Sequence, residues 1–196
     1  MPKGRLEAFS DGVIAIIITI MVLEMKVPHD ATAGALLPLL PVLLSYVLSF
    51  LYLGIYWSNH HHLLHTVRNV SGGILWSNLH LLFWLSLVPF ATGWMGETHF
   101  GALPTALYGV VLLMCAIAYY ILQSVIVARE GPDSTLRRAI GRDVKGKGSL
   151  ALYVVALLGV WQWPGLAQAI YILVALIWLI PDRRIERSTT HAGSHT

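Results

Sequence analysis

The segment nearest the N-terminus combines a charged motif with a run of aliphatic residues. Arg5, Phe9, Ser10 and Asp11 precede a mainly aliphatic stretch that ends before Pro28. A carboxylate about one turn into such a stretch is costly unless another group pairs with it. Arg5 and Asp11 are separated by about 120° around a helix and therefore cannot pair with each other along it. Each of the two charges needs a partner on another segment.

The aliphatic residues that follow the motif share one face of the predicted helix. At 100° per residue, Ile16, Ile20 and Leu23 fall within roughly 60° of one another, and Thr19 lies at the edge of this stripe. Asp11 points about 140° away from Ile16 and should therefore face a different helix. Taken alone, an aliphatic stripe of this kind indicates core packing or contact with lipid.

A second candidate is the cluster of histidines at His60, His61, His62 and His65. His61 and His65 have the spacing of a helical metal-binding pair. The same helix offers no acidic partner and no H-E-x-x-H motif, and His80 alone does not complete a haem pair. We therefore predict no metal and no cofactor, and expect a histidine to bond the buried charge of the first segment.

The remaining polar residues are typical of hydrogen bonds between helices. No Ser-His-Asp order, P-loop or Gly-rich phosphate cradle is present, so we predict that the protein is not an enzyme. The second apolar segment carries a polar stripe at alternating spacings of four and three residues, formed by Ser45, Ser49, Tyr52, Tyr56 and Asn59.

The composition predicts that these motifs lie on membrane-spanning helices. Of the 196 residues, 56% are hydrophobic and only 12% are charged, against roughly 25% charged in soluble domains. A span needs about 20 apolar residues. Six segments are predicted to cross the membrane, at about 6–27, 36–65, 74–95, 103–128, 149–163 and 165–181.

The distribution of basic residues indicates the topology. With a cytoplasmic N-terminus and six spans, Lys26 is the only one of the 13 basic residues outside the cytoplasmic segments. Merging the last two spans would move the cluster at 183–187 outside and break the positive-inside pattern. We therefore predict six spans in one domain (residues 1–187), both termini in the cytoplasm, and a polar tail at 188–196. Contact with lipid accounts for the basic loops, and no motif supports nucleic-acid binding.

Several short strings in the first three spans match a known family. They are Arg5-x-x-x-Phe9-Ser10-Asp11, Tyr46-x-x-Ser49-Phe50, Trp57-x-x-His60-His61 and Val88-Pro89-Phe90. Together they resemble the signature of the transmembrane protein 175 family, which comprises the endosomal and lysosomal potassium channels of animals and their prokaryotic relatives. The resemblance covers the six-span length, and its specific motifs lie in the first two spans.

The resemblance implies a fold, an assembly and a function. A single six-span repeat is similar to the prokaryotic members, which assemble as homotetramers. It implies a multi-pass protein of the cell membrane that conducts potassium in preference to sodium without a conventional selectivity-filter loop. In the family the first spans line the pore, and a ring of aliphatic side chains constricts it.

The resemblance also assigns roles to individual residues. The constriction would comprise Ile16, Ile20 and Leu23, with Thr19 beside them. Potassium would be the permeant ion and no cofactor is implied. A polar network behind the pore would comprise the motif residues Arg5, Phe9, Ser10, Asp11, Trp57 and His60.

A second interpretation of the same residues stays open at this point. Asp11 and His60 could relay protons or cations in a coupled secondary transporter. Such a protein would show saturable, substrate-coupled flux and no single-channel currents.

Overall fold

The computed structural model describes residues 2–131 and 143–179, and within these ranges all regular secondary structure is helical. Four helical segments are long and apolar enough to cross a membrane, which confirms an all-helical membrane protein. The predicted tail at 188–196 and the basic cluster at 183–187 lie outside the described residues. The elements are α1 (Lys3–Leu23), the 3-10 helix η1 (Ala33–Leu39), α2 (Leu40–His65), α3 (Gly72–Ser86), α4 (Val88–Glu97), α5 (Ala102–Glu130), α7 (Val144–Gly159) and α8 (Pro164–Leu179).

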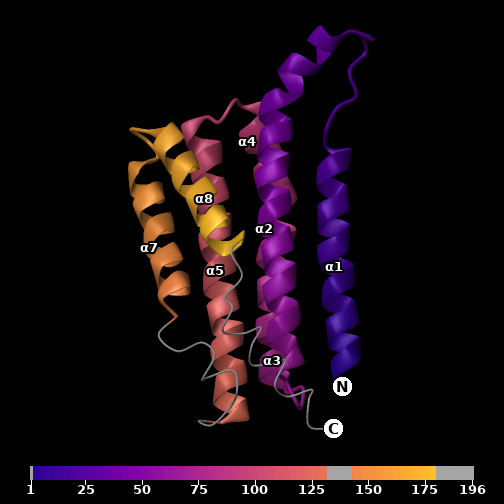
Figure 1. The fold of residues 1–196 in the computed structure, drawn as a ribbon, viewed down its shortest axis with the longest axis vertical. Helices are drawn as coiled ribbons and strands as arrows, with labels where there is room; N and C mark the ends of the chain where they lie inside the picture. The colour runs from indigo at the N-terminus through magenta and orange to yellow at the C-terminus, as the bar shows by residue number, and fades with distance from the viewer. Residues whose placement is uncertain (1, 132–142, 180–196) are drawn as a thin grey trace.

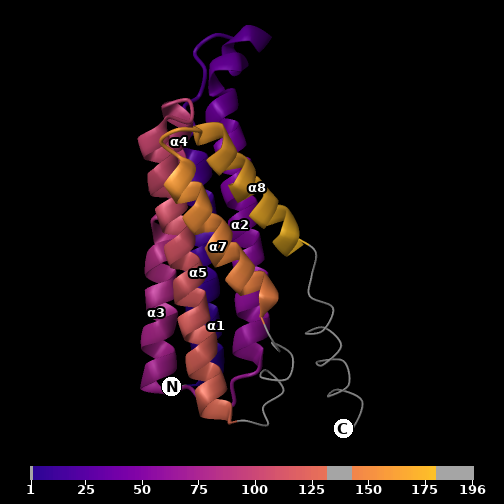
Figure 2. The same cartoon turned by 90° about the vertical axis from the view of Figure 1, so that its left-hand side faces the viewer.

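The long helices α1, α2, α3 and α5 run along a common direction as a bundle, and α7 and α8 cross this direction obliquely (Figures 1 and 2). Helix α5 packs against α3, α4, α7 and α8, whereas α1 packs against α2, α3 and α4. The pair α7 and α8 lies on the side of the bundle away from α1 (Figure 1). Helix α1 is therefore a peripheral element of the single chain, although it carries the motif.

The segment from 72 to 97 bends at Leu87, between α3 and α4. Pro89 has no N–H, so it cannot donate to the carbonyl of Leu85, and its ring disfavours a regular helix at this point. The Leu87 N–H instead bonds the Trp84 carbonyl at 3.2 Å, in a 3-10 turn. The helix then resumes, and the Ala91 N–H bonds the Leu87 carbonyl at 3.1 Å.

Hydrogen-bonded side chains cross the interior of the bundle. The Ser49 hydroxyl lies 2.6 Å from the Thr92 hydroxyl and 2.9 Å from that of Tyr108, which joins α2 to α4 and α5. The Tyr52 hydroxyl donates to the Tyr171 carbonyl and accepts from the Tyr153 hydroxyl at 3.2 Å. Among the described residues, no buried side-chain nitrogen or oxygen lacks a partner. Since unpaired polar groups are costly in a membrane, these bonds fix how the helices meet.

Polar contacts also join neighbouring helices at both ends of the bundle. At one end the Lys3 ammonium donates to the His65 carbonyl at 2.7 Å, and the Arg68 N–H donates to the Glu130 carboxylate at 3.0 Å. At the other end, the Lys26 ammonium lies 3.0 Å from the Glu97 carboxylate. These contacts tie α1 to α2, the α2–α3 connection to α5, and the segment after α1 to α4.

The last two helices are shorter than the first four apolar segments. Helices α7 and α8 have 16 residues each, or about 24 Å at 1.5 Å per residue, against roughly 30 Å of hydrocarbon in a bilayer. Asp143 begins α7 with a left-handed backbone (φ 39°) and accepts from the Gly146 N–H at 3.1 Å. A side chain at Gly146 would collide with this carboxylate and force it to move out of its capping position.

Candidate functional site

The two faces of α1 have opposite environments. One face is buried against the bundle and contains Leu6, Ser10, Ile14, Ile17 and Met21. The opposite face is uncovered along the length of the helix. It contains Arg5, Phe9, Ile16, Thr19, Ile20 and Leu23.

The predicted aliphatic stripe lies on this uncovered face. Ile16 is 59% exposed, Ile20 41% and Leu23 79%, so none of the three is needed to fill the core of the chain. The Thr19 hydroxyl donates to the Ile16 carbonyl at 2.9 Å. Its hydrogen is therefore used within the helix, while its oxygen can still accept a hydrogen bond or face an ion.

A groove runs beside this face, between α1 and α4. It has a volume of about 700 Å³. Ile16 and Ile20 of α1 line it, together with Glu24 just after that helix and with Phe90 and Trp94 of α4. Its walls are mainly apolar, and the carboxylates of Glu24 and Glu97 lie at its margin.

Asp11 has the interhelical partner that its position requires. The Trp57 indole N–H donates to its carboxylate at 3.0 Å, which joins α1 to α2. Asp11 is half-buried and Trp57 is 48% exposed, so this bond lies at the edge of the helix pair. Asp11 thus faces a neighbouring helix rather than the side of α1 that carries Ile16.

A second set of contacts is fully buried and joins three helices. The Ser10 hydroxyl donates to the Leu6 carbonyl at 2.9 Å, so its oxygen accepts from the Asn78 amide at 2.9 Å. The Asn78 amide oxygen lies 2.6 Å from His60 Nε2. Since that oxygen can only accept, the hydrogen of the His60 ring sits on Nε2. The chain of donors therefore runs from His60 through Asn78 to Ser10 and ends on the helix backbone.

The structure divides the predicted network in two and leaves two members out: Arg5, and Phe9, which is 52% exposed and joins neither part. Asp11 bonds Trp57, whereas His60 reaches Ser10 through Asn78, and the expected bond from a histidine to Asp11 is not formed. Arg5 is exposed and bonds no motif residue in the described part of the chain. Its angular position places it with Ile16 on the uncovered face.

Asn78 is the residue of this site that the sequence analysis missed. In the sequence it is one of the remaining polar residues typical of hydrogen bonds between helices, whereas in the structure it is the link between α1 and α2. Only the register of three helices brings it between Ser10 and His60. The signal available in the sequence was an amide at membrane depth in an otherwise apolar segment.

The other histidines form no metal site within the described residues. His61 and His65 lie one turn apart on α2 with their rings tilted by 50° and the ring centroids 6.3 Å apart, and both are exposed. Among the residues that the structure describes, no group of three or more His, Cys, Asp or Glu side chains could hold a metal ion.

Comparison with known proteins defines the class. The family model of the endosomal/lysosomal potassium channel TMEM175 matches residues 5–89, from the motif arginine to the proline that breaks the third segment. A potassium channel of Chryseobacterium sp. (strain P1-3) is 57% identical over 188 residues, which is 96% of this chain and 98% of the relative. A potassium channel of Streptomyces collinus is 38% identical over 128 residues, or 60% of this chain and 61% of the relative.

A solved structure shares the same fold. It is the crystal structure of a lysosomal potassium-selective channel TMEM175 homologue from Chamaesiphon minutus, with a TM-score of 0.81, 28% sequence identity, and coverage of 92% of this chain and 97% of that one. The chain is therefore a membrane channel protein and not an enzyme. It is a prokaryotic member of the TMEM175 family of potassium channels.

Proposed function

We propose that the protein is a potassium-selective channel in which α1 helices from four copies of the chain line one pore. The observation that carries this proposal is the uncovered aliphatic face of α1. The opposite face of α1 is packed into the bundle. Within one chain, therefore, only that face of the helix is covered by other residues. If four copies assemble around a common axis, the exposed faces of their α1 helices line the pore.

Ile16, Ile20 and Leu23 would form the narrowest part of that pore. A ring of aliphatic side chains excludes water, and an ion cannot cross a dry apolar neck without losing its hydration. Opening would turn or separate the α1 helices so that the Thr19 oxygen or backbone groups face the ion. No conventional selectivity-filter loop is needed in this arrangement.

The polar contacts behind α1 would set its rotation in the assembly. The bond from Trp57 to Asp11 and the chain from His60 through Asn78 to Ser10 both hold the motif side of α1 against the bundle. They keep the aliphatic face directed away from the chain's own core. Rotation of α1 would require these bonds to break or shift together. Their strength would therefore determine how easily the pore opens.

Preference for potassium over sodium is inferred from the relatives. The curated relatives are named potassium channels, and the C. minutus homologue is titled potassium-selective. Glu24 and Asp30 near the non-motif end of α1 would add a mild attraction for cations at the pore mouth.

We further propose that the protein lies in the plasma membrane and crosses it six times as one domain. Both termini would lie in the cytoplasm. The described basic residues support this topology. Lys3 and Arg68 lie at the end of the bundle that also contains Glu130 and the start of α7, whereas Lys26 lies at the other end. Helices α7 and α8 would be the fifth and sixth spans.

The substitution Ile16→Asn tests the assignment of the constriction. An amide at the neck would let water enter, so we expect potassium flux into liposomes to rise several-fold and discrimination against sodium to fall. Leu158→Asn is the matched control, because Leu158 is 79% exposed on α7 but lies away from α1. The control should leave flux and selectivity unchanged.

Equal effects from the two substitutions would show that membrane damage, and not a pore position, explains any change. Unchanged flux and selectivity in Ile16→Asn protein that still assembles would refute the assignment of the constriction.

A further inference from the structure

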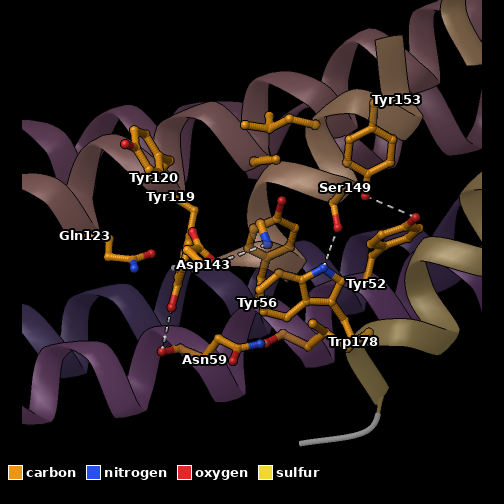
Figure 3. A pocket seen from close by; sticks show the side chains of 14 residues that line it. Tyr52, Tyr56, Asn59, Tyr119, Tyr120, Gln123, Asp143, Ser149, Tyr153 and Trp178 are labelled. Atoms are coloured by element: carbon orange, nitrogen blue, oxygen red, sulfur yellow. Dashed lines mark hydrogen bonds between the residues drawn. The ribbon is translucent and has the colours of Figure 1, made fainter. Parts of the chain in front are cut away.

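A second hollow lies within the single chain, on the side of the bundle away from α1. It is enclosed by α2, α5, α7 and α8 and is lined by six aromatic side chains (Figure 3). Trp178 is held in place by donating to the Ser149 hydroxyl at 2.8 Å. The aromatic residues are Tyr52, Tyr56, Tyr119, Tyr120, Tyr153 and Trp178.

Among the described residues, the lining of this pocket carries a single charge, and that charge is negative. It is the carboxylate of Asp143, and no lysine or arginine in the part of the chain that the structure describes lines the pocket. The backbone N–H of Gly146 bonds the Asp143 carboxylate, but a neutral donor does not cancel its charge. No ion pair within the described residues involves Asp143. The faces of aromatic rings also attract cations. The aromatic walls and the carboxylate therefore both favour a positively charged ligand.

The pocket contains acceptors that the protein leaves free. Asn59 donates its amide N–H to the Ile55 carbonyl at 2.8 Å, which leaves its amide oxygen available. The Tyr56 hydroxyl and the Gln123 amide make no hydrogen bond within the described residues, and both belong to the lining. An ammonium group has three N–H donors and no acceptor, so it matches this set.

The size of the pocket limits the ligand. Its volume is about 50 Å³, which is space for roughly three to five waters at 10–15 Å³ each. A chain of about four non-hydrogen atoms fills such a volume. Tyr120 is 45% exposed, so the pocket is open on its side and a longer tail could extend outward.

We propose that this pocket binds a short primary alkylammonium group, with the ammonium near Asp143 and the carbon chain between the tyrosine and tryptophan rings. A bare potassium ion fits less well, because it needs a full shell of oxygen ligands to replace its water. The same ammonium chemistry is found in free small amines and in the head group of ethanolamine phospholipids. The proposal does not depend on the proposed channel function.

The test is a calorimetric titration of n-propylammonium chloride into the full-length protein in detergent, compared with 1-propanol. Propanol has the same number of non-hydrogen atoms but no charge. We expect saturable binding of the ammonium and none of the alcohol. Asp143→Asn should weaken binding at least about tenfold, because a charge-assisted bond is lost, while its amide oxygen can still cap α7.

Asp30→Asn is the matched control, since it removes an exposed carboxylate outside the pocket and should leave the affinity unchanged. Tyr56→Leu, which removes an aromatic wall but no charge, should also weaken binding and provides an independent variant. The proposal would be overturned if propanol bound as well as n-propylammonium, or if no saturable binding were seen. It would also be overturned if the Asp143→Asn and Tyr56→Leu proteins bound n-propylammonium like the parent.

Titration in lipid nanodiscs distinguishes the two sources of the ammonium group. If ethanolamine phospholipids occupy the pocket, adding them to the nanodisc should lower the apparent affinity for n-propylammonium severalfold. If the affinity is the same with and without them, the site binds free amines. Either result supports the site, provided that Asp143→Asn has the matching consequence in the same nanodiscs. It should remove the effect of the phospholipids in the first case and weaken the binding of n-propylammonium in the second.

Discussion

Replacing Asn78 by leucine tests the buried contacts that join α1 to the rest of the chain. Leucine is larger than asparagine but has the same branching at Cγ, and it can neither accept from His60 nor donate to Ser10. Ser10 keeps its bond to the Leu6 carbonyl, so the His60 Nε2–H is the group left without a partner. The hydrogen-bonding part of the expected loss therefore comes from one stranded donor, and the larger side chain adds overpacking at this buried site.

The expected loss of stability follows from that single orphaned group. A buried donor without a partner costs about 1–3 kcal/mol, and interhelical hydrogen bonds in membrane proteins average about 0.6 kcal/mol with a maximum near 1.7. We therefore expect Asn78→Leu to lower the free energy of unfolding by about 1–3 kcal/mol. The measurement is reversible unfolding in mixed micelles, followed by circular dichroism.

The double variant Asn78→Leu with His60→Phe separates hydrogen bonding from packing. With both partners apolar, no donor is stranded, so the double variant should lose about 0.5–1 kcal/mol less than the sum of the two single variants. Asn69→Leu serves as the control, because Asn69 is exposed and should change stability by less than about 0.5 kcal/mol. An Asn78→Leu protein as stable as the parent, or strictly additive variants, would refute the hydrogen-bond chain.

Three further substitutions test other contacts. Gly109→Ala places a methyl group against the Tyr171 hydroxyl. This overpacking should lower the free energy of unfolding by about 1–3 kcal/mol. A melting temperature equal to that of the parent would contradict the close approach of α5 and α8. Trp57→Phe removes the donor to the motif aspartate and should cost about 1 kcal/mol in the same assay, whereas Trp76→Phe, at an exposed position, should cost nothing measurable. Glu97→Gln breaks an exposed ion pair and should lower stability by no more than about 1 kcal/mol, an effect that vanishes in high salt if the pair is correctly assigned.

The fold class could be predicted because composition and apolar length decide it. Few residues are charged, and long apolar segments have no alternative to helices in a membrane. The bend at Leu87 follows from Pro89, whose missing N–H is visible in the sequence. The separation of Ile16 from Asp11 around α1 follows from helical periodicity alone.

The partners of the motif residues could not be derived in the same way. Which side chain meets Asp11 depends on how α1 and α2 are offset along their axes, and periodicity within one helix does not contain that offset. A histidine was expected there, but Trp57 lies three residues earlier and takes the position. The role of Asn78 likewise depends on the placement of a third helix.

The central claim is that this chain forms a potassium-selective pore. The most direct test is a planar-bilayer recording of the purified protein with potassium on one side and sodium on the other. A selective channel gives discrete single-channel currents whose reversal potential lies near the potassium equilibrium potential. A reversal potential near zero would contradict potassium selectivity, and saturable flux without any single-channel current would instead identify a coupled transporter that uses Asp11 and His60.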